Sequence, residues 1–204
     1  MASRTSPTVG AGPRGVNDKT PLTRAGGSSK VGPVMATARS SSLAGWRRQA
    51  VRRIETVRKA TLAFVATLPE DAVVRPRTID QWSVKDVLAH LMSCDEETVR
   101  RFKLIARGRG DKIFWFRGMA DADRFNARTV GQARRLGLAA VLRRMAKAHA
   151  DVIEWLERLP VESLRDPSHE WTVVEWLPVP GWRHEADHVS EIKDWWRQEK
   201  KRRG

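Results

Sequence analysis

The chain has 204 residues, a formal net charge of +14 and a single cysteine, Cys94. This length suits one domain with tails, and a lone cysteine excludes an internal disulfide and is typical of a reducing compartment, so we expect a cytoplasmic protein. No apolar run approaches the roughly 20 residues of a membrane-spanning helix, so no membrane partner is expected.

The positive charge is spread over the whole chain. A basic balance permits contact with nucleic acid or anionic lipid, but no recognised nucleic-acid motif is present. We therefore expect no specific nucleic-acid partner, and at most binding that ignores DNA sequence and weakens with salt.

Residues 1–42 are rich in Gly, Pro, Ser and Thr and contain few large apolar side chains. Such a segment buries too little surface to offset the entropy of ordering, so we expect a disordered basic extension. Its arginines and serines resemble those of an organelle transit peptide. The weak apolar periodicity instead favours a non-functional extension, with Met35 as an alternative start. A second basic tail is expected at residues 197–204.

Three long helices are expected before the C-terminal one. The first is predicted from Leu43 to Leu68, where apolar residues recur every three or four positions. The second is predicted to begin after Ser83, an N-cap whose capping-box partner would be Asp86, and to reach Ile105 or Ala106. The third is predicted from about Leu136 to Leu159.

The region between the second and third helices, residues 107–135, is expected to be a long connection. Its aromatic triplet Phe114-Trp115-Phe116 could wall a substrate pocket or simply cover the end of the bundle. Further along, Trp171–Leu177 repeats the pattern of Trp82–Leu88, which indicates two similar helical hairpins. With no credible strand, the pattern predicts an all-α four-helix bundle over residues 43–196.

The last long helix follows Pro180 and carries His184 and His188 one turn apart. Side chains at i and i+4 lie about 5–6 Å apart at Cβ, close enough to bind one metal ion together. Two histidines hydrogen-bonded at the edge of a core explain the same spacing. His90, beside the apolar stripe of the second helix, would complete a three-histidine set with an open fourth position.

Other residues near this set have two interpretations. Cys94 could approach the site, but a buried spectator thiol is the favoured interpretation. Asp86 could orient His90, although a capping role is favoured. Glu185 and Glu191 lie on the last helix but flank the ligand line, which favours exposed acids over a general base. The catalytic residues therefore remain unknown.

These motifs together resemble the DinB/YfiT-like superfamily: Trp82-Ser83-Val84-Lys85-Asp86-Val87-Leu88-Ala89-His90, then Phe125-Asn126, then His184-x-x-x-His188. This superfamily of metal-binding four-helix bundles includes the metal-binding domain of mycothiol-dependent maleylpyruvate isomerase. The resemblance, over roughly residues 43–196, implies a divalent metal held by His90, His184 and His188. The more distant ClbS/DfsB branch shares the early Trp-Ser-Val signal, but we do not expect the late histidine pair there.

The resemblance implies a metal-dependent enzyme acting on a small molecule, either a hydrolase or a thiol-dependent transferase or isomerase. Zinc is the expected metal, with nickel as the alternative, and a low-molecular-weight thiol is a candidate cofactor. The alternatives are a metal-free binding or self-protection protein and a non-specific nucleic-acid binder. The substrate is not indicated, and a homodimer is left open.

Overall fold

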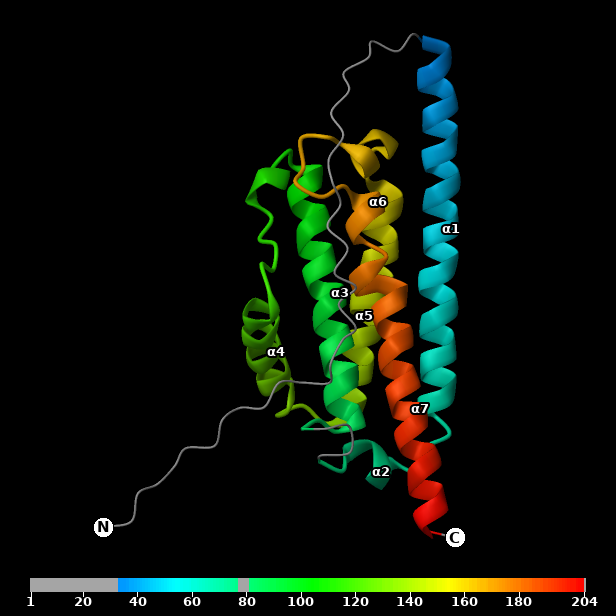
Figure 1. The fold of residues 1–204 in the computed structure, drawn as a ribbon, viewed down its shortest axis with the longest axis vertical. Coiled ribbons are helices and arrows are strands. Elements are labelled where there is room, and N and C mark those ends of the chain that lie inside the picture. Colours follow the sequence, from blue (N-terminus) through cyan, green and yellow to red (C-terminus); the bar gives the residue numbers. More distant parts are fainter. Residues whose placement is uncertain (1–32, 77–80, 204) are drawn as a thin grey trace, which may run out of the picture.

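The computed structural model describes residues 33–76 and 81–203, with side chains from residue 42 onward. The described chain is built on four long helices: α1 (Pro33–Val65), α3 (Val84–Ala106), α5 (Leu138–Arg158) and α7 (His184–Arg203). They run side by side, as Figure 1 shows, and no strand occurs in the described ranges. The predicted all-α four-helix bundle is therefore confirmed.

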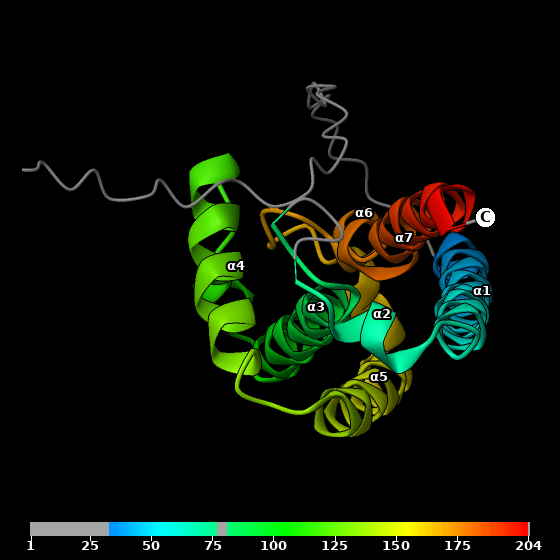
Figure 2. The ribbon, with the colours of Figure 1, turned by 90° about the horizontal axis from the view of Figure 1, so that it is seen from below.

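Shorter elements connect the long helices. These are α2 (Glu70–Val74), α4 (Met119–Ala133) and α6 (Val173–Trp176), together with the short turns η1 (Gly110–Lys112), η2 (Val161–Arg165) and η3 (Val179–Arg183), the last a π-helical turn. Seen along the bundle in Figure 2, α4 lies outside the four long helices, beside α3. None of the helices in the described ranges is long and apolar enough to cross a membrane.

Both ends of the bundle extend beyond the predicted boundaries. Helix α1 begins at Pro33, earlier than the expected Leu43, so the expected limit of the N-terminal extension at residue 42 falls inside a helix. Residues 1–32 lie outside the described residues, and disorder there stays a prediction. Helix α7 continues to Arg203, through the segment expected to be a separate tail.

The predicted caps are present at the starts of α3 and α6. The backbone N–H of Asp86 donates to Oγ of Ser83 at 3.0 Å, and the N–H of Ser83 donates to the Asp86 carboxylate at 3.1 Å. At α6, the Glu175 carboxylate accepts from the backbone N–H of Thr172 at 2.8 Å. Each bond satisfies a backbone group that a helix start leaves free, which is why both repeats begin helices.

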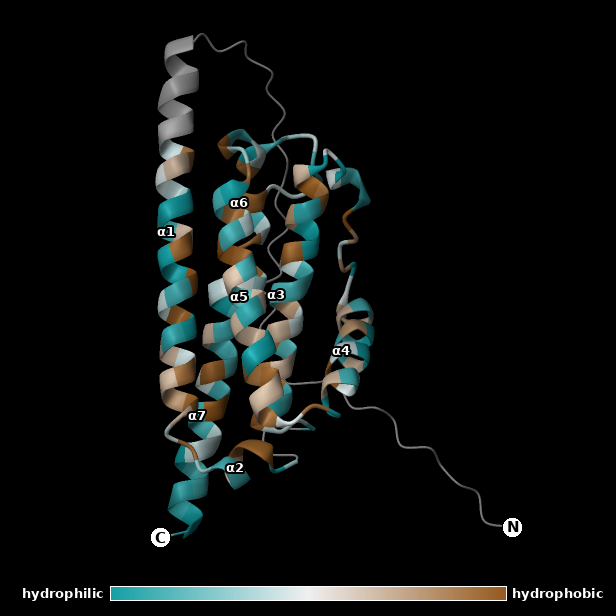
Figure 3. Ribbon diagram, turned by 180° about the vertical axis from the view of Figure 1, so that it is seen from behind, coloured by the Kyte–Doolittle hydropathy of each residue, from teal (hydrophilic) through white to brown (hydrophobic). Residues whose placement is uncertain are grey.

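The core consists of two apolar clusters stacked along the bundle. Helix α3 contributes to both, with Leu88, Leu91 and Met92 in one cluster and Phe102 and Ile105 in the other. In Figure 3, hydrophobic residues alternate along the long helices with hydrophilic ones, whereas the C-terminal end of α7 is almost wholly hydrophilic. Because α3 buries apolar side chains in both clusters, it stabilises the packing of the neighbouring helices along its whole length.

The expectation of an irregular connection over residues 107–135 is wrong, because most of it forms α4. Only Val130 and Ala133 of α4 are buried. The helix has just three large apolar side chains, Met119, Phe125 and Val130, too few for an apolar stripe to stand out in the sequence. Trp115, from the aromatic triplet, is buried in the second cluster and lies 5.9 Å from Trp176 between ring centroids. This residue covers the bundle, whereas Phe114 is 56% exposed.

Candidate metal centre

Two long helices bring three imidazoles to one point. His90 comes from α3, and His184 and His188 come from the first turns of α7. Nε2 of His184 lies 3.1 Å from Nε2 of His90 and 3.0 Å from Nε2 of His188. His90 and His188 are buried, and His184 is partly buried. Sequence reasoning brought these three residues together as candidates, and the structure places them together.

The local sequence explains where the histidine pair begins. Pro178 precedes the π-helical turn and Pro180 lies within it, and Gly181 leaves helical geometry there, with φ −83° and ψ −117°. The chain is kinked at this point, and α7 starts afresh at His184. From this start, residues 184 and 188 lie one turn apart on the same face, against α3.

Neighbouring side chains hold the imidazoles in place. Nδ1 of His188 lies 2.8 Å from a carboxylate oxygen of Glu191, so Nδ1–H donates a hydrogen bond to this carboxylate and Nε2 of His188 keeps a free lone pair. The Trp82 ring lies 5.1 Å from the His90 ring and 6.5 Å from the His188 ring, between centroids. Glu191 therefore orients the imidazole of His188, and the Trp82 ring packs beside the rings of His90 and His188.

Burial keeps the imidazoles of His90 and His184 neutral. It lowers the pKa of His90 well below its ordinary value, and the charges of His184 and His188 lower it further, against a small opposing effect of Asn126. Burial and then His188 lower the pKa of His184 to about 3. At neutral pH both rings are unprotonated, and a metal requires histidine ligands in that form.

The three nitrogens fit a metal better than they fit one another. Nε2 of His184 lies close to Nε2 of both His90 and His188, and Nε2 of His188 is an acceptor. One N–H on His184 can point at only one of these two nitrogens, so some of the nitrogen lone pairs face each other. A divalent ion at 2.0–2.1 Å from each nitrogen would place ligands about 3.3–3.4 Å apart in tetrahedral geometry. The two separations from Nε2 of His184, 3.1 and 3.0 Å, are close to this value, and the group could hold a metal ion.

A model of the DinB superfamily matches residues 53–192. The chain belongs to the DinB superfamily. Comparisons with curated proteins and with solved structures give no match. The matched region contains His90, His184 and His188, so the candidate metal centre lies within the DinB bundle.

Polar groups from two other positions border the centre of this DinB protein. Sγ of Cys94, one turn after His90 on α3, lies 3.8 Å from Nε2 of His90. Asn126 of α4 is close enough to His90 to affect its pKa. Asp86 does not orient His90, because it caps Ser83 and lies 3.5 Å from Arg134. The capping role expected for Asp86 is the one observed.

A buried ion-pair cluster lies next to the candidate metal centre, and the sequence analysis did not predict it. Arg58 of α1 donates to Glu185 at 2.8 and 3.0 Å and to Asp95 at 2.9 Å. Glu185 follows His184, and Asp95 follows Cys94, so the cluster joins α1 to both ligand-bearing helices. Glu185 is buried and paired with Arg58, which corrects the expectation of an exposed acid.

The protonation equilibria of this cluster reflect burial opposed by pairing. Burial alone would lower the pKa of Arg58, but Asp95 and Glu185 more than offset this and raise it above its ordinary value. For Asp95, burial outweighs the nearby guanidinium and raises the pKa to about 6. The cluster therefore contains a firmly charged arginine beside an acid that titrates close to neutral pH.

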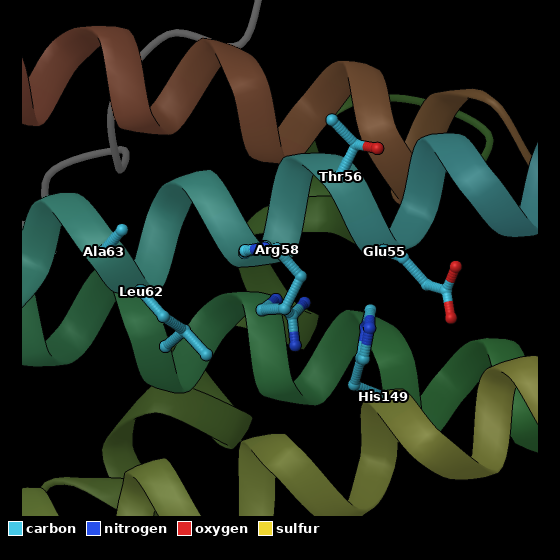
Figure 4. A pocket seen from close by; sticks show the side chains of 7 residues that line it. Glu55, Thr56, Arg58, Leu62, Ala63 and His149 are labelled. Atoms are coloured by element: carbon cyan, nitrogen blue, oxygen red, sulfur yellow. The ribbon is translucent and has the colours of Figure 1, made fainter.

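An open groove of about 770 Å³ is lined by residues of α1, including Arg58, and by His149 of α5 (Figure 4). His149 of α5 faces Arg58 there, and burial followed by the charge of Arg58 lowers the pKa of His149 to about 4. His169 lies elsewhere, against Gly110, where any Cβ would collide with its ring. Neither histidine belongs to the three-imidazole group.

Proposed function

We propose that this DinB-superfamily protein is a metal-dependent enzyme that acts on a small molecule, with His90, His184 and His188 as ligands. The observation that supports this most directly is the approach of Nε2 of His184 to both other Nε2 atoms, at 3.1 and 3.0 Å. Three protein ligands leave a further position for water or substrate, as in catalytic rather than structural zinc sites. Zinc is the favoured metal, and nickel is the alternative because imidazole binds both ions well.

Three neighbouring side chains have different roles around this open coordination position. A bound divalent ion would supply Lewis-acid activation of a water or a thiol. Glu191 accepts a hydrogen bond from Nδ1–H of His188, so Nε2 of His188 stays available as a ligand. Trp82 shields His90 and His188 from water on one side. Asn126 supplies an amide beside His90 that could hydrogen-bond a bound molecule.

The proposal covers two reaction classes: hydrolysis, and transfer to a low-molecular-weight thiol. Both need a nucleophile that a metal makes acidic, and neither requires a separate base beside the ligands. Glu185 is unsuited to act as a general base, since its carboxylate is already bonded to Arg58. Screening ester or amide hydrolysis against thiol conjugation in the zinc-loaded protein would separate the two classes.

Metal analysis of the purified protein tests the proposal. We expect one equivalent of zinc or nickel in the wild type and loss of that equivalent in each of His90→Ala, His184→Ala and His188→Ala. His149→Ala and His169→Ala are matched controls that should retain the metal, because both rings lie outside the cluster. The proposal would be refuted if the wild-type protein bound no divalent metal, or if the His188→Ala variant bound the metal as tightly as the wild type.

A further inference from the structure

Arg101 of α3 is a buried cation whose hydrogen-bonding capacity is only partly used. The residue is 7% exposed, and its Nε donates to a carboxylate oxygen of Glu97 at 3.0 Å. The same carboxylate accepts two hydrogen bonds from Arg100, at 2.7 and 2.8 Å. Within the described residues, Nη1 and Nη2 of Arg101 donate no hydrogen bond. Two guanidinium groups therefore share one carboxylate, which leaves one positive charge without an acid partner.

The other buried arginine, Arg58, shows the contrast. Its two carboxylate partners raise its pKa above the ordinary value in spite of burial. Burial lowers the pKa of Arg101, and the charge of Glu97 offsets this only in part. An arginine keeps its proton at physiological pH even so, which means that Arg101 is a charged group with room for a second anionic partner.

Three aromatic rings surround this guanidinium. Its central carbon lies 4.6 Å from the ring centroid of Trp115, 5.4 Å from that of Trp176 and 5.8 Å from that of Phe116. Stacking of this kind holds the plane of a guanidinium and keeps water from its faces. The hydrogen atoms on Nη1 and Nη2 point outward in that plane, so an acceptor that approaches edge-on is the one that fits.

Arg101 also lies in line with the candidate metal centre. His90 and Arg101 are eleven residues apart on α3, which places them on the same face within about 20°. The bond to Glu97 holds the guanidinium over the turn before Arg101, and Glu97 is about 10 Å along the helix axis from His90. The free edge of Arg101 is therefore roughly this far from the three imidazoles.

An aromatic wall continues from Arg101 towards the imidazoles. The Phe116 ring, which lies over Arg101, is 5.4 Å from the Phe125 ring of α4, between centroids. The next residue of α4, Asn126, is close enough to His90 to affect its pKa. Helix α4 packs against α3, so the same two helices border both the metal centre and Arg101.

We propose that Arg101 binds a carboxylate at one end of the substrate, while the other end of the substrate reacts at the metal centre. This inference rests on the proposed three-histidine site. It assigns the substrate to the class of elongated monocarboxylates, with an apolar body that lies beside Phe116 and Phe125. A carboxylate matches the site because it carries one charge and two coplanar oxygens, whereas a phosphate dianion would exceed the single unpaired charge of Arg101.

A molecule with a metal-binding group at one end and a carboxylate at the other tests this assignment. The probe is the monohydroxamate of suberic acid, whose hydroxamate binds zinc, and its methyl ester is the uncharged match of the same length. The monohydroxamate of succinic acid and its methyl ester form a second pair that is too short to reach from the metal to Arg101. Isothermal titration calorimetry on the zinc-loaded full-length protein measures the four affinities in the wild type, Arg101→Met, Arg101→Lys and Arg100→Met.

We expect the wild type to bind the suberic acid probe at least about tenfold more tightly than its ester. Arg101→Met should bind the two equally and keep the wild-type affinity for the ester. Arg101→Lys should show an intermediate preference, because an ammonium keeps the charge but loses the planar fork. Arg100→Met is the matched control and should keep the full preference, since Arg100 pairs with the same Glu97 but is 47% exposed. The succinic pair should show no preference in any variant.

Equal affinity of the wild type for the suberic acid probe and its ester would overturn the role of Arg101, and so would a preference that survives in both Arg101 variants. Binding of the ester in either case would leave the metal site intact. A matching phosphonate that bound more tightly than the carboxylate would overturn the substrate class. No binding of any hydroxamate to the zinc-treated wild type would overturn the metal site and the inference with it.

Discussion

Replacement of Arg58 by methionine tests the energetics of the cluster behind the metal centre. The guanidinium side chain is 5% exposed and makes three hydrogen bonds of 2.8–3.0 Å to Asp95 and Glu185, whose side chains are 11% and 6% exposed. Methionine fills much of the same volume but leaves both carboxylates buried without a cation. The penalty is thus the cost of unpaired buried charge rather than of lost packing.

Breaking a buried ion pair by removing one partner costs about 3–5 kcal/mol, whereas an exposed pair contributes about 0–1 kcal/mol. With a urea m-value of about 2 kcal/mol/M, the unfolding midpoint should fall by about 1.5–2.5 M. Part of this loss should be recovered in acid. Burial already raises the pKa of Asp95 to about 6, and removal of Arg58 would raise it further.

The sign of the pH effect follows from that raised pKa. A folded-state pKa above the unfolded value means that the folded protein holds the proton more tightly, so stability from this group is present at low pH and is lost as pH rises through the folded pKa. The difference between wild type and Arg58→Met should therefore be smaller at pH 5 than at pH 8. Urea unfolding followed by circular dichroism at both values measures it.

Arg100→Met is the matched control, because Arg100 pairs with Glu97 on the surface of α3 and its side chain is 47% exposed. It should lose less than about 1 kcal/mol at either pH. If Arg58→Met cost no more than Arg100→Met, the reasoning about the buried cluster would be refuted. An equal loss at pH 5 and pH 8 would refute the assignment of the pH effect to Asp95.

Three further outcomes are expected. Ser83→Ala should lower the free energy of unfolding by about 1 kcal/mol, because a helix N–H loses its cap; unchanged thermal unfolding would argue against this. Burial lowers the pKa of His149 to about 4, below its ordinary value of 6.5, so the unfolded chain binds a proton first as pH falls. Wild type should therefore lose stability from pH 6.5 to 4 more steeply than His149→Gln, and parallel curves would contradict this. Affinity for duplex DNA, with net charge +14, should fall steeply with salt and ignore sequence; salt-resistant, sequence-selective binding in a filter assay would reverse this expectation.

Local chemistry made most of the bundle predictable. The start of α3 depends on Ser83 and Asp86, which lie three residues apart, so their pairing is visible in the sequence. Helix α4 was not predictable in this way. Two of the contacts near its C-terminal end come from α3, where Lys85 donates to the carbonyl groups of Arg134 and Leu136. Tertiary packing stabilises this helix, which has few large apolar residues to mark it in the sequence.

The buried stripe of α1 shows a second limit. Val57 and Phe64 fit the three- and four-residue apolar spacing expected of this helix, whereas the structure buries Arg58 and Val65 more deeply. An arginine is normally assigned to the surface, and its partners Asp95 and Glu185 lie far away in the chain. A signal existed, since Arg58 lies four residues after buried Ile54, but only the partners explain its burial.

The candidate site was predictable to the level of residue identity but not of geometry. The i,i+4 spacing indicates that His184 and His188 share a face, whereas the inclusion of His90 depended on the family resemblance and on facing helices. The bond from His188 to Glu191 required coordinates, because the same spacing would allow the carboxylate to point into solvent. Orientation of rings depends on packing that no short motif encodes.

The central claim is that His90, His184 and His188 bind one divalent ion, and anomalous diffraction at the zinc edge from crystals grown with zinc tests it most directly. The account expects a single strong peak at about 2.0–2.1 Å from Nε2 of each of the three histidines. A peak bound to other residues, or the three imidazoles still in mutual contact with no peak between them at saturating zinc, would contradict it.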